Sequence, residues 1–231
     1  MSDIAAHPVH LGGQLDPHLS RGLWLVKWLL AIPHYFILFF LYFAFFLFTL
    51  VAFFAILFTG VYPRSLFDFN VGVLRWSWRV AFYSYGALGT DKYPPFTLKE
   101  VPDYPAQLRI DYPERLARPR VLVKWLLSFP HLLIVGVLLG GGGSWAANGK
   151  GASAGTTGLV SLLVVIAGFA LLFTTRYPRG IYDFVLGLDR WVARVAAYYF
   201  LMTDTYPPFR LDMGEADPDT AGPVAAGAEG L

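Results

Sequence analysis

The chain has 231 residues, of which 56% are hydrophobic and 15% are charged, and its formal net charge is +2. A soluble domain usually has about a quarter of its residues charged, so this composition argues against a water-facing fold, and the small net charge predicts no nucleic-acid partner. The sequence contains no cysteine, which excludes disulfide and thiolate chemistry.

A long apolar segment follows the first twenty residues. It covers residues 21–60 and has no charged side chain from Phe36 to Phe58. Uninterrupted apolar runs of this kind suit hydrocarbon better than water. The residues before it have neither a basic start nor a small-residue cleavage site, so we expect no removable signal peptide.

A Tyr-Pro-Arg turn at residues 62–64 predicts that a helix begins there, because proline is favoured in the first turn of a helix. Starting with the arginine of this turn, five residues follow one another at intervals of four, four, three and four positions. This spacing places them on one helix face: Arg64, Asp68, Gly72, Arg75 and Arg79. Aromatic and apolar residues occupy the rest of the helix. We therefore expect an amphipathic helix that lies along the lipid headgroups.

Short segments in which apolar residues alternate with other residues lie beside proline turns, and this pattern predicts β-strands. They lie at residues 9–11, 96–98, 108–112 and 209–211. Two strands from each half of the chain would pair into a small cytoplasmic sheet that holds the halves together.

The chain repeats itself. The segment Leu-Val-Lys-Trp-Leu-Leu at residues 25–30 returns at residues 122–127, an offset of 97, and Tyr-Pro-Arg at residues 62–64 returns at residues 177–179, an offset of 115. A duplication of this length predicts two copies of one module. We place repeat 1 at residues 1–100 and repeat 2 at residues 101–212, and we expect the acidic tail, residues 213–231, to be disordered.

The change of offset marks an 18-residue insertion in repeat 2, the Gly-rich stretch at about residues 140–157. A flexible polar loop cannot lie in hydrocarbon, so we place it outside the bilayer. Repeat 2 then has one apolar segment on each side of the loop, each about as long as one spanning helix. We expect the same helical hairpin in repeat 1, with its turn near Leu41 to Phe46.

The placement of the basic residues supports two hairpins. Residues 1–20, 61–120 and 176–231 would share one side of the membrane, and every Lys or Arg except Lys150 lies in or beside these segments. The positive-inside rule makes that side cytoplasmic. The alternative, a single long helix in repeat 1, would divide the basic residues between both sides. We therefore predict an all-α membrane protein with two tandem transmembrane helical hairpins, about four spanning helices, and both termini in the cytoplasm.

The Arg stripe recurs in repeat 2, and its functional interpretation is a surface that binds anionic lipid or phosphate. The candidate residues are Arg64, Arg75, Arg79, Arg179, Arg190 and Arg194. The alternative is that Arg64 and Asp68 make an ordinary i, i+4 pair and that the other arginines only mark the cytoplasmic side.

Ionisable residues within or beside the apolar segments form a second set of candidates: Lys27, His34, Asp68, Lys124, His131 and Asp183. Such residues are costly in a membrane and suggest function. A histidine with a nearby carboxylate or lysine would form a proton relay or hold a lipid headgroup. The alternative is that the lysines snorkel while the histidines bond carbonyls freed by the preceding prolines.

Four motifs carry a family resemblance: Val-Lys-Trp-Leu-Leu-Ala-Ile-Pro-His (26–34), Leu-Phe-Thr-Gly-Val-Tyr-Pro-Arg (57–64), Phe-Asp-Phe-Asn-Val-Gly-Val-Leu-Arg-Trp (67–76) and Asp-Lys-Tyr-Pro-Pro-Phe (91–96). Together they resemble a prokaryotic membrane family catalogued as domain of unknown function 4389 (DUF4389), present as two copies. Repeat 2 departs from the pattern by its insertion and by Thr175-Arg176 in place of Thr59-Gly60. The resemblance implies residence in the bacterial cytoplasmic membrane and brings no activity or catalytic residue.

The function we expect is a non-enzymatic membrane protein that interacts with anionic lipids or docks a partner protein or a second copy of itself. We assign no catalytic residue, metal site or cofactor, because no nucleophile with a base and no phosphate-binding loop is visible. The alternatives are a small transporter or proton-coupled permease that uses His34 and His131, and then a lipid-modifying enzyme.

Overall fold

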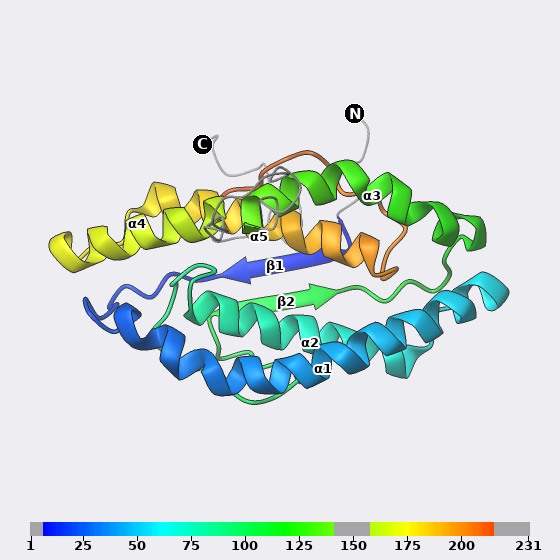
Figure 1. The fold of residues 1–231 in the computed structure, drawn as a ribbon, viewed down its shortest axis with the longest axis horizontal. Coiled ribbons are helices and arrows are strands. Elements are labelled where there is room, and N and C mark those ends of the chain that lie inside the picture. The colour runs from blue at the N-terminus through cyan, green and yellow to red at the C-terminus, as the bar shows by residue number, and fades with distance from the viewer. Residues whose placement is uncertain (1–6, 141–157, 215–231) are drawn as a thin grey trace, which may run out of the picture.

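The computed structural model describes residues 7–140 and 158–214, and this part of the chain is mostly helical (Figure 1). In chain order its elements are β1 (Val9–Gly13), α1 (Trp24–Thr59), α2 (Arg64–Tyr83), β2 (Ala106–Ile110), α3 (Arg118–Leu139), α4 (Leu159–Thr174) and α5 (Arg179–Tyr199). In each half an apolar helix is followed by a second helix that runs back along it.

Helix α1 is one unbroken helix of 36 residues, so the hairpin turn predicted near Leu41 to Phe46 is wrong. Its length is about 54 Å at 1.5 Å per residue. The physical reason is that residues 36–58 contain no glycine, proline or charged residue that would end a helix. The helix stops only at Gly60, which adopts the left-handed conformation (φ 76°) typical of a helix C-terminus.

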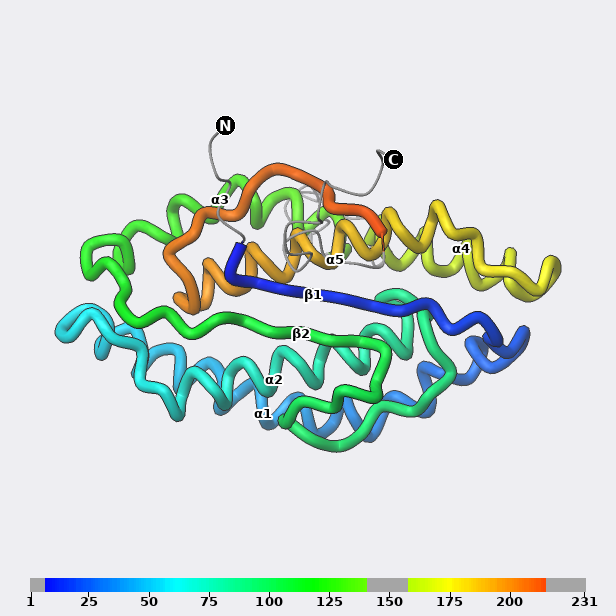
Figure 2. The backbone as a smooth tube through the Cα atoms, turned by 180° about the vertical axis from the view of Figure 1, so that it is seen from behind, coloured from blue at the N-terminus to red at the C-terminus, as the bar shows by residue number. Residues whose placement is uncertain are grey.

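Helices α3 and α4 together occupy the place that α1 has in the first half. The start of α4 touches the end of α3, because a Cβ atom on Gly158 would lie 2.4 Å from the carbonyl oxygen of Leu138. Both helices pack along α5, as α1 packs along α2, and α4 extends beyond α3 in Figures 1 and 2. The predicted insertion therefore interrupts one long helix and does not join two antiparallel arms. Residues 141–157 themselves lie outside the described part of the chain.

Two helices of the described segments are long and apolar enough to cross a membrane, α1 and α3, with mean hydropathies of 2.7 and 2.0. Helix α4 is apolar but shorter. Only 22% of the apolar window in α1 and 28% of that in α3 are buried. The core helix of a soluble protein is covered on most sides, so these exposed apolar helices indicate association with a membrane. Four separate spanning helices are not seen in residues 7–140 and 158–214.

The two halves are interlocked through the sheet. Strands β1 and β2 pair antiparallel with Leu11 opposite Leu108. Strand β1 precedes α1 in the chain but packs on α5, while β2 precedes α3 and packs on α2 (Figure 2). The helices predicted after the two Tyr-Pro-Arg turns are confirmed as α2 and α5, and they lie between the apolar helices and the strands.

Two of the four predicted strands are confirmed, and the segments at residues 96–98 and 209–211 are not strands. In the first of them, the carbonyl oxygen of Leu98 accepts a hydrogen bond from Arg75 Nη1 (3.2 Å). A side chain thus takes the place that a neighbouring strand would fill. The predicted disorder of the tail stays a prediction, since residues 215–231 are not described.

Candidate functional site

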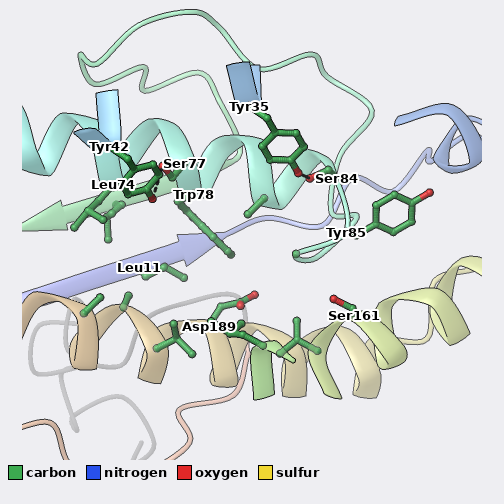
Figure 3. Close-up of a pocket in the computed structure, with 18 of the residues that line it drawn as sticks. Leu11, Tyr35, Tyr42, Leu74, Ser77, Trp78, Ser84, Tyr85, Ser161 and Asp189 are labelled. Carbon is green, nitrogen blue, oxygen red and sulfur yellow. Dashed lines mark hydrogen bonds between the residues drawn. The ribbon is translucent and has the colours of Figure 1, made fainter. Parts of the chain in front are cut away.

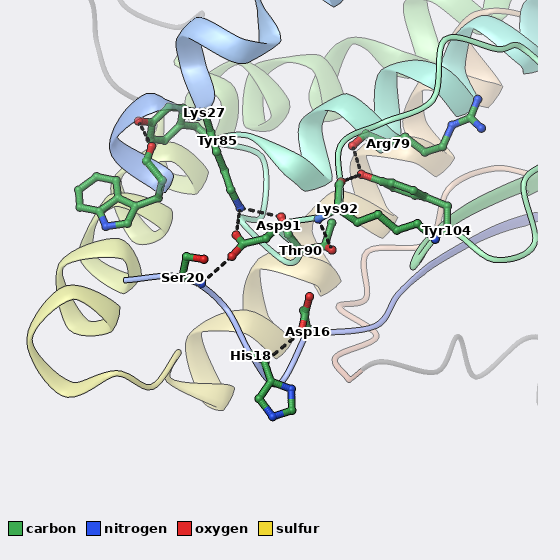
Figure 4. A network of polar contacts seen from close by, with 11 residues as sticks. Asp16, His18, Ser20, Lys27, Arg79, Tyr85, Thr90, Asp91, Lys92 and Tyr104 are labelled. Atoms are coloured by element: carbon green, nitrogen blue, oxygen red, sulfur yellow. Dashed lines mark hydrogen bonds and ion pairs between the residues drawn. The ribbon is translucent and has the colours of Figure 1, made fainter. Parts of the chain in front are cut away.

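The lysine candidate of each half is buried against a carboxylate from the loop after α2 or α5. Lys27 Nζ lies 2.8 Å from Asp91 Oδ1 and donates to the carbonyl oxygen of Thr90 at 2.6 Å (Figure 4). Lys124 Nζ lies 2.6 Å from Asp204 Oδ1 and donates to the carbonyl oxygen of Thr203 at 2.8 Å. Both lysines are completely enclosed, so neither snorkels to water.

The partner carboxylates Asp91 and Asp204 were missed by the sequence analysis. A signal for them exists, because Thr-Asp-x-Tyr-Pro-Pro-Phe occurs at residues 90–96 and again at residues 203–209. In the first half the backbone N–H of Ser20 also donates to Asp91 Oδ2. Burial raises the pKa of Asp91, but the hydrogen bonds from Lys27 and Ser20 and the positive charge of Lys27 outweigh this effect, so the pKa lies below its ordinary value.

The two candidate histidines each lie in an aromatic cage. His34 is fully buried, its Nδ1 accepts a hydrogen bond from Trp76 Nε1 (3.1 Å), and its ring stacks on Phe96 with centroids 4.0 Å apart. His131 stacks on Phe209 with centroids 4.1 Å apart. Both phenylalanines belong to the Tyr-Pro-Pro-Phe segments, which therefore close over the histidines.

The carboxylates expected near these histidines lie elsewhere. Asp68 is exposed and pairs with Arg64 at 3.4 Å, and Asp183 is half-buried on α5. Within the described residues, the ring and hydrogen-bond contacts of His34 and His131 are aromatic, and none is a carboxylate or a lysine. The structure does not bring together the side chains that a proton relay needs.

Four of the six arginines in the predicted stripes bond their own chain: Arg79, Arg190 and Arg194 are buried, and Arg75 is largely buried. Arg75 Nε donates to the carbonyl oxygen of Leu108 at 3.0 Å, and Arg190 Nε donates to that of Leu11 at 2.7 Å. Arg79 donates to the carbonyl oxygens of Thr97 and Lys99, and Arg194 pairs with Asp212. Burial, and secondly the charge of Arg75, lower the pKa of Arg79 to about 10, so the group stays cationic at neutral pH.

Six exposed arginines lie at the ends of the long apolar helices, while exposed Arg109 lies on strand β2. Arg64 and Arg179, the remaining members of the stripes, are exposed at the first residues of α2 and α5. Four further exposed arginines flank the apolar helices. They are Arg21 before α1, Arg118 and Arg120 at the start of α3, and Arg176 after α4. Cationic side chains thus lie at both ends of α1 and at both ends of the α3–α4 pair.

A cavity of about 500 Å³ lies where the two halves meet (Figure 3). Helices α2 and α5 form its walls, and Leu11 and Leu108 from the strands line it. Asp189 of α5 points into this space, and its Oδ2 atom is buried without a hydrogen-bond partner in the described structure. Burial raises the pKa of Asp189 well above its ordinary value.

A family model described as domain of unknown function (DUF4389) matches residues 21–97 and 155–210. The two matched segments are consistent with two copies of the domain. No curated protein matches the chain. No solved structure matches it.

Proposed function

The chain belongs to the DUF4389 family, whose description assigns no activity, and we propose that it is a non-enzymatic membrane protein that lies along one face of the bilayer and binds anionic lipids. The observation that carries this proposal is the position of the exposed arginines at both ends of both long apolar helices. The apolar faces of α1 and of the α3–α4 pair would enter the lipid, and α2, α5 and the sheet would stay on the aqueous side.

The outward faces of these helices suit lipid. Phe39, Phe43 and Phe58 of α1 and Leu126 and Phe173 of α3 and α4 are each at least 70% exposed. A row of large apolar side chains on a long helix is costly in water and favourable in hydrocarbon. Aromatic residues such as Trp28 and Trp125, also exposed near the helix starts, are the type found at the membrane interface.

The position of α2 argues against an upright α1. Tyr42 donates to Ser77 Oγ at 2.9 Å and Asn70 Nδ2 donates to Thr49 Oγ1 at 3.1 Å, so α2 lies alongside the most apolar part of α1. Behind α2 come charged groups and irregular loops, including the Arg75–Glu100 ion pair. If this part of α1 crossed the bilayer, those groups would lie at the depth of the hydrocarbon, where they are very unfavourable.

Length and charge favour the same arrangement. A helix of about 54 Å exceeds the hydrocarbon thickness of about 30 Å by more than an ordinary tilt of up to about 40° accommodates. An upright helix would also divide the flanking arginines, with Arg21 on one side and Arg64 on the other. An α1 in the membrane plane keeps both in one headgroup layer, which agrees with the positive-inside rule. The proposal thus keeps the basic residues on one side and replaces the four crossings by in-plane helices, α1 and the α3–α4 pair.

Cysteine labelling tests this arrangement, and the natural chain contains no cysteine that would interfere. We expect Ser20→Cys and Ser65→Cys, which are exposed beyond the two ends of α1, to react with a membrane-impermeant maleimide from the cytoplasmic side only. Phe43→Cys, halfway between them, should react from neither side because lipid covers it. Labelling of residues 20 and 65 from opposite sides would refute the in-plane arrangement, and aqueous labelling of residue 43 from the outer side would support a hairpin.

Lipid analysis tests the binding of anionic headgroups. Each arginine near the headgroup layer should contribute about 1 kcal/mol, a roughly fivefold preference for anionic lipid. In the triple variant Arg21→Gln, Arg118→Gln and Arg176→Gln we expect the ratio of phosphatidylglycerol to phosphatidylcholine that co-purifies to fall well below the wild-type ratio, towards that of the bulk mixture. The matched control removes three exposed charges near the sheet and its loops, Lys92→Gln, Lys99→Gln and Arg109→Gln, and should keep the wild-type ratio. Equal ratios in the two variants would contradict the proposal.

A further inference from the structure

The cavity between the two halves opens towards the apolar side of the molecule. Its rim includes Tyr35 of α1 and Leu139 of α3, and both residues are half exposed among the outward apolar side chains. Its volume of about 500 Å³ lies within the range of small-molecule sites. A molecule that enters from lipid would therefore meet this opening first.

The polar groups of the cavity wall differ in how they are satisfied. Tyr42 and Ser77 hydrogen-bond each other at 2.9 Å, and Tyr35 and Ser84 do so at 3.0 Å. Asp189 Oδ2, on the opposite wall, is buried and has no partner among the described residues (Figure 3). A buried carboxyl oxygen without a partner is unfavourable and calls for an explanation.

The two halves of the chain differ at this position. With the offset of 115, Asp189 corresponds to Leu74, and both residues line the cavity. A leucine thus fits this wall in one half, so packing alone does not require a carboxyl group. The carboxyl group of Asp189 is an addition to an otherwise mainly apolar wall.

We infer that this cavity binds a single-chain membrane amphiphile whose head group, a hydroxyl or an amine, donates a hydrogen bond to Asp189. The inference rests on the proposed function, since the ligand is taken from the lipid that covers α1 and α3. The hydrocarbon chain lies among the apolar residues that line the cavity. An anionic head group is disfavoured, because no Lys or Arg lines the cavity in the described part of the chain and an anion would be buried there without a counter-charge.

Photo-crosslinking in phosphatidylcholine vesicles tests the inference with three probes, diazirine-bearing analogues of hexadecanol, hexadecylamine and palmitate. We expect the alcohol or the amine to label residues of the cavity wall, such as Trp78 and Val192, and palmitate to label them far less. Asp189→Leu should reduce this labelling roughly tenfold, as expected for the loss of one buried hydrogen bond to a charged or strongly polar group. Asp183→Asn, on the same helix but outside the cavity wall, is the matched control and should leave labelling unchanged.

The variants should fold, because Leu74 already occupies the equivalent position and Asp189 Oδ2 has no hydrogen bond to lose among the described residues. A wild-type melting temperature of Asp189→Leu verifies this. Asp189→Asn keeps an acceptor oxygen but cannot ionise to pair with an ammonium group, so it should retain the alcohol and lose the amine. That result shows that the amine needs the ionised carboxyl group, and loss of both probes shows that each head group depends on the carboxyl group of Asp189. Cavity labelling that is equal in wild type and Asp189→Leu would overturn the inference, as would palmitate labelling equal to that by the alcohol and the amine.

If all probes label the outer face of α1 but not the cavity, the inference fails while the proposed function stands. If α1 is unlabelled as well, the proposed function fails.

Discussion

Replacing Asp91 by alanine is expected to lower the free energy of unfolding by about 3–5 kcal/mol, because the change leaves the Lys27 ammonium group buried without its counter-ion. Lys27 is 1% exposed, and Asp91 Oδ1 lies 2.8 Å from its Nζ atom. Asp204→Ala should have an effect of similar size on Lys124. Denaturant titration in a mild detergent, followed by tryptophan fluorescence, measures both.

Two controls separate the ion pair from a general effect of losing a carboxylate. Asp103→Ala removes an exposed carboxylate from the same loop and should change stability by less than about 0.5 kcal/mol. The double variant Lys27→Met and Asp91→Leu should recover most of the loss, since an apolar pair of similar volume often replaces a buried ion pair at little cost. A cost of Asp91→Ala below about 1 kcal/mol would show that the ammonium group is not dependent on Asp91.

The pH dependence gives the same ion pair a second signature. The pKa of Asp91 is lower in the folded protein than its ordinary value of 3.8. Its contribution to stability is therefore fully present above that value, and it is lost as the pH falls through the folded pKa. The wild type should lose stability below about pH 4, and Asp91→Ala should lose less over the same interval.

The sequence predicted the helices after the two Tyr-Pro-Arg turns correctly, because proline at a helix start and the 3.6-residue period are local signals. It failed for α1, because the turn was transferred from the insertion in the second half. Residues 41–46, Leu-Tyr-Phe-Ala-Phe-Phe, contain no residue that favours a turn. Composition also does not distinguish an apolar helix that crosses a bilayer from one that lies in its plane, since that depends on what packs behind the helix.

The candidate site was predicted in part for similar reasons. Spacing places Arg75 and Arg79 on one helix face, but it does not reveal that the loop after α2 folds over that face and supplies carbonyl acceptors. Asp91 was visible as part of a repeated motif, although its partner in α1 is far away in the chain. Asp189 was visible as a departure from the repeat, with Leu74 at the matching position. Its burial depends on the packing of the two halves, which no local pattern contains.

Replacing Arg190 by alanine should destabilise the protein by about 3–6 kcal/mol, because two charge-assisted hydrogen bonds at about 1.5–3 kcal/mol each are lost. Its guanidinium group donates to the carbonyl oxygens of Leu11 in β1 and Asp212 beyond α5, and the side chain is 1% exposed. These bonds hold β1 to α5. Arg190→Lys should restore little, since a single ammonium group cannot reach both acceptors in the planar geometry of a guanidinium.

The same variant decides between the two interpretations of the Arg stripe. If Arg190 holds the halves together, the folded fraction of Arg190→Ala keeps the wild-type ratio of anionic to neutral lipid while its unfolding midpoint falls. Arg64→Ala, whose side chain is exposed, is the matched control and should change stability by at most about 1 kcal/mol. An Arg190→Ala protein with wild-type stability and depleted anionic lipid would instead show that the stripe itself binds the headgroups. Burial and the carbonyl acceptors favour the first outcome, because a guanidinium enclosed by its own chain has no face left for a phosphate.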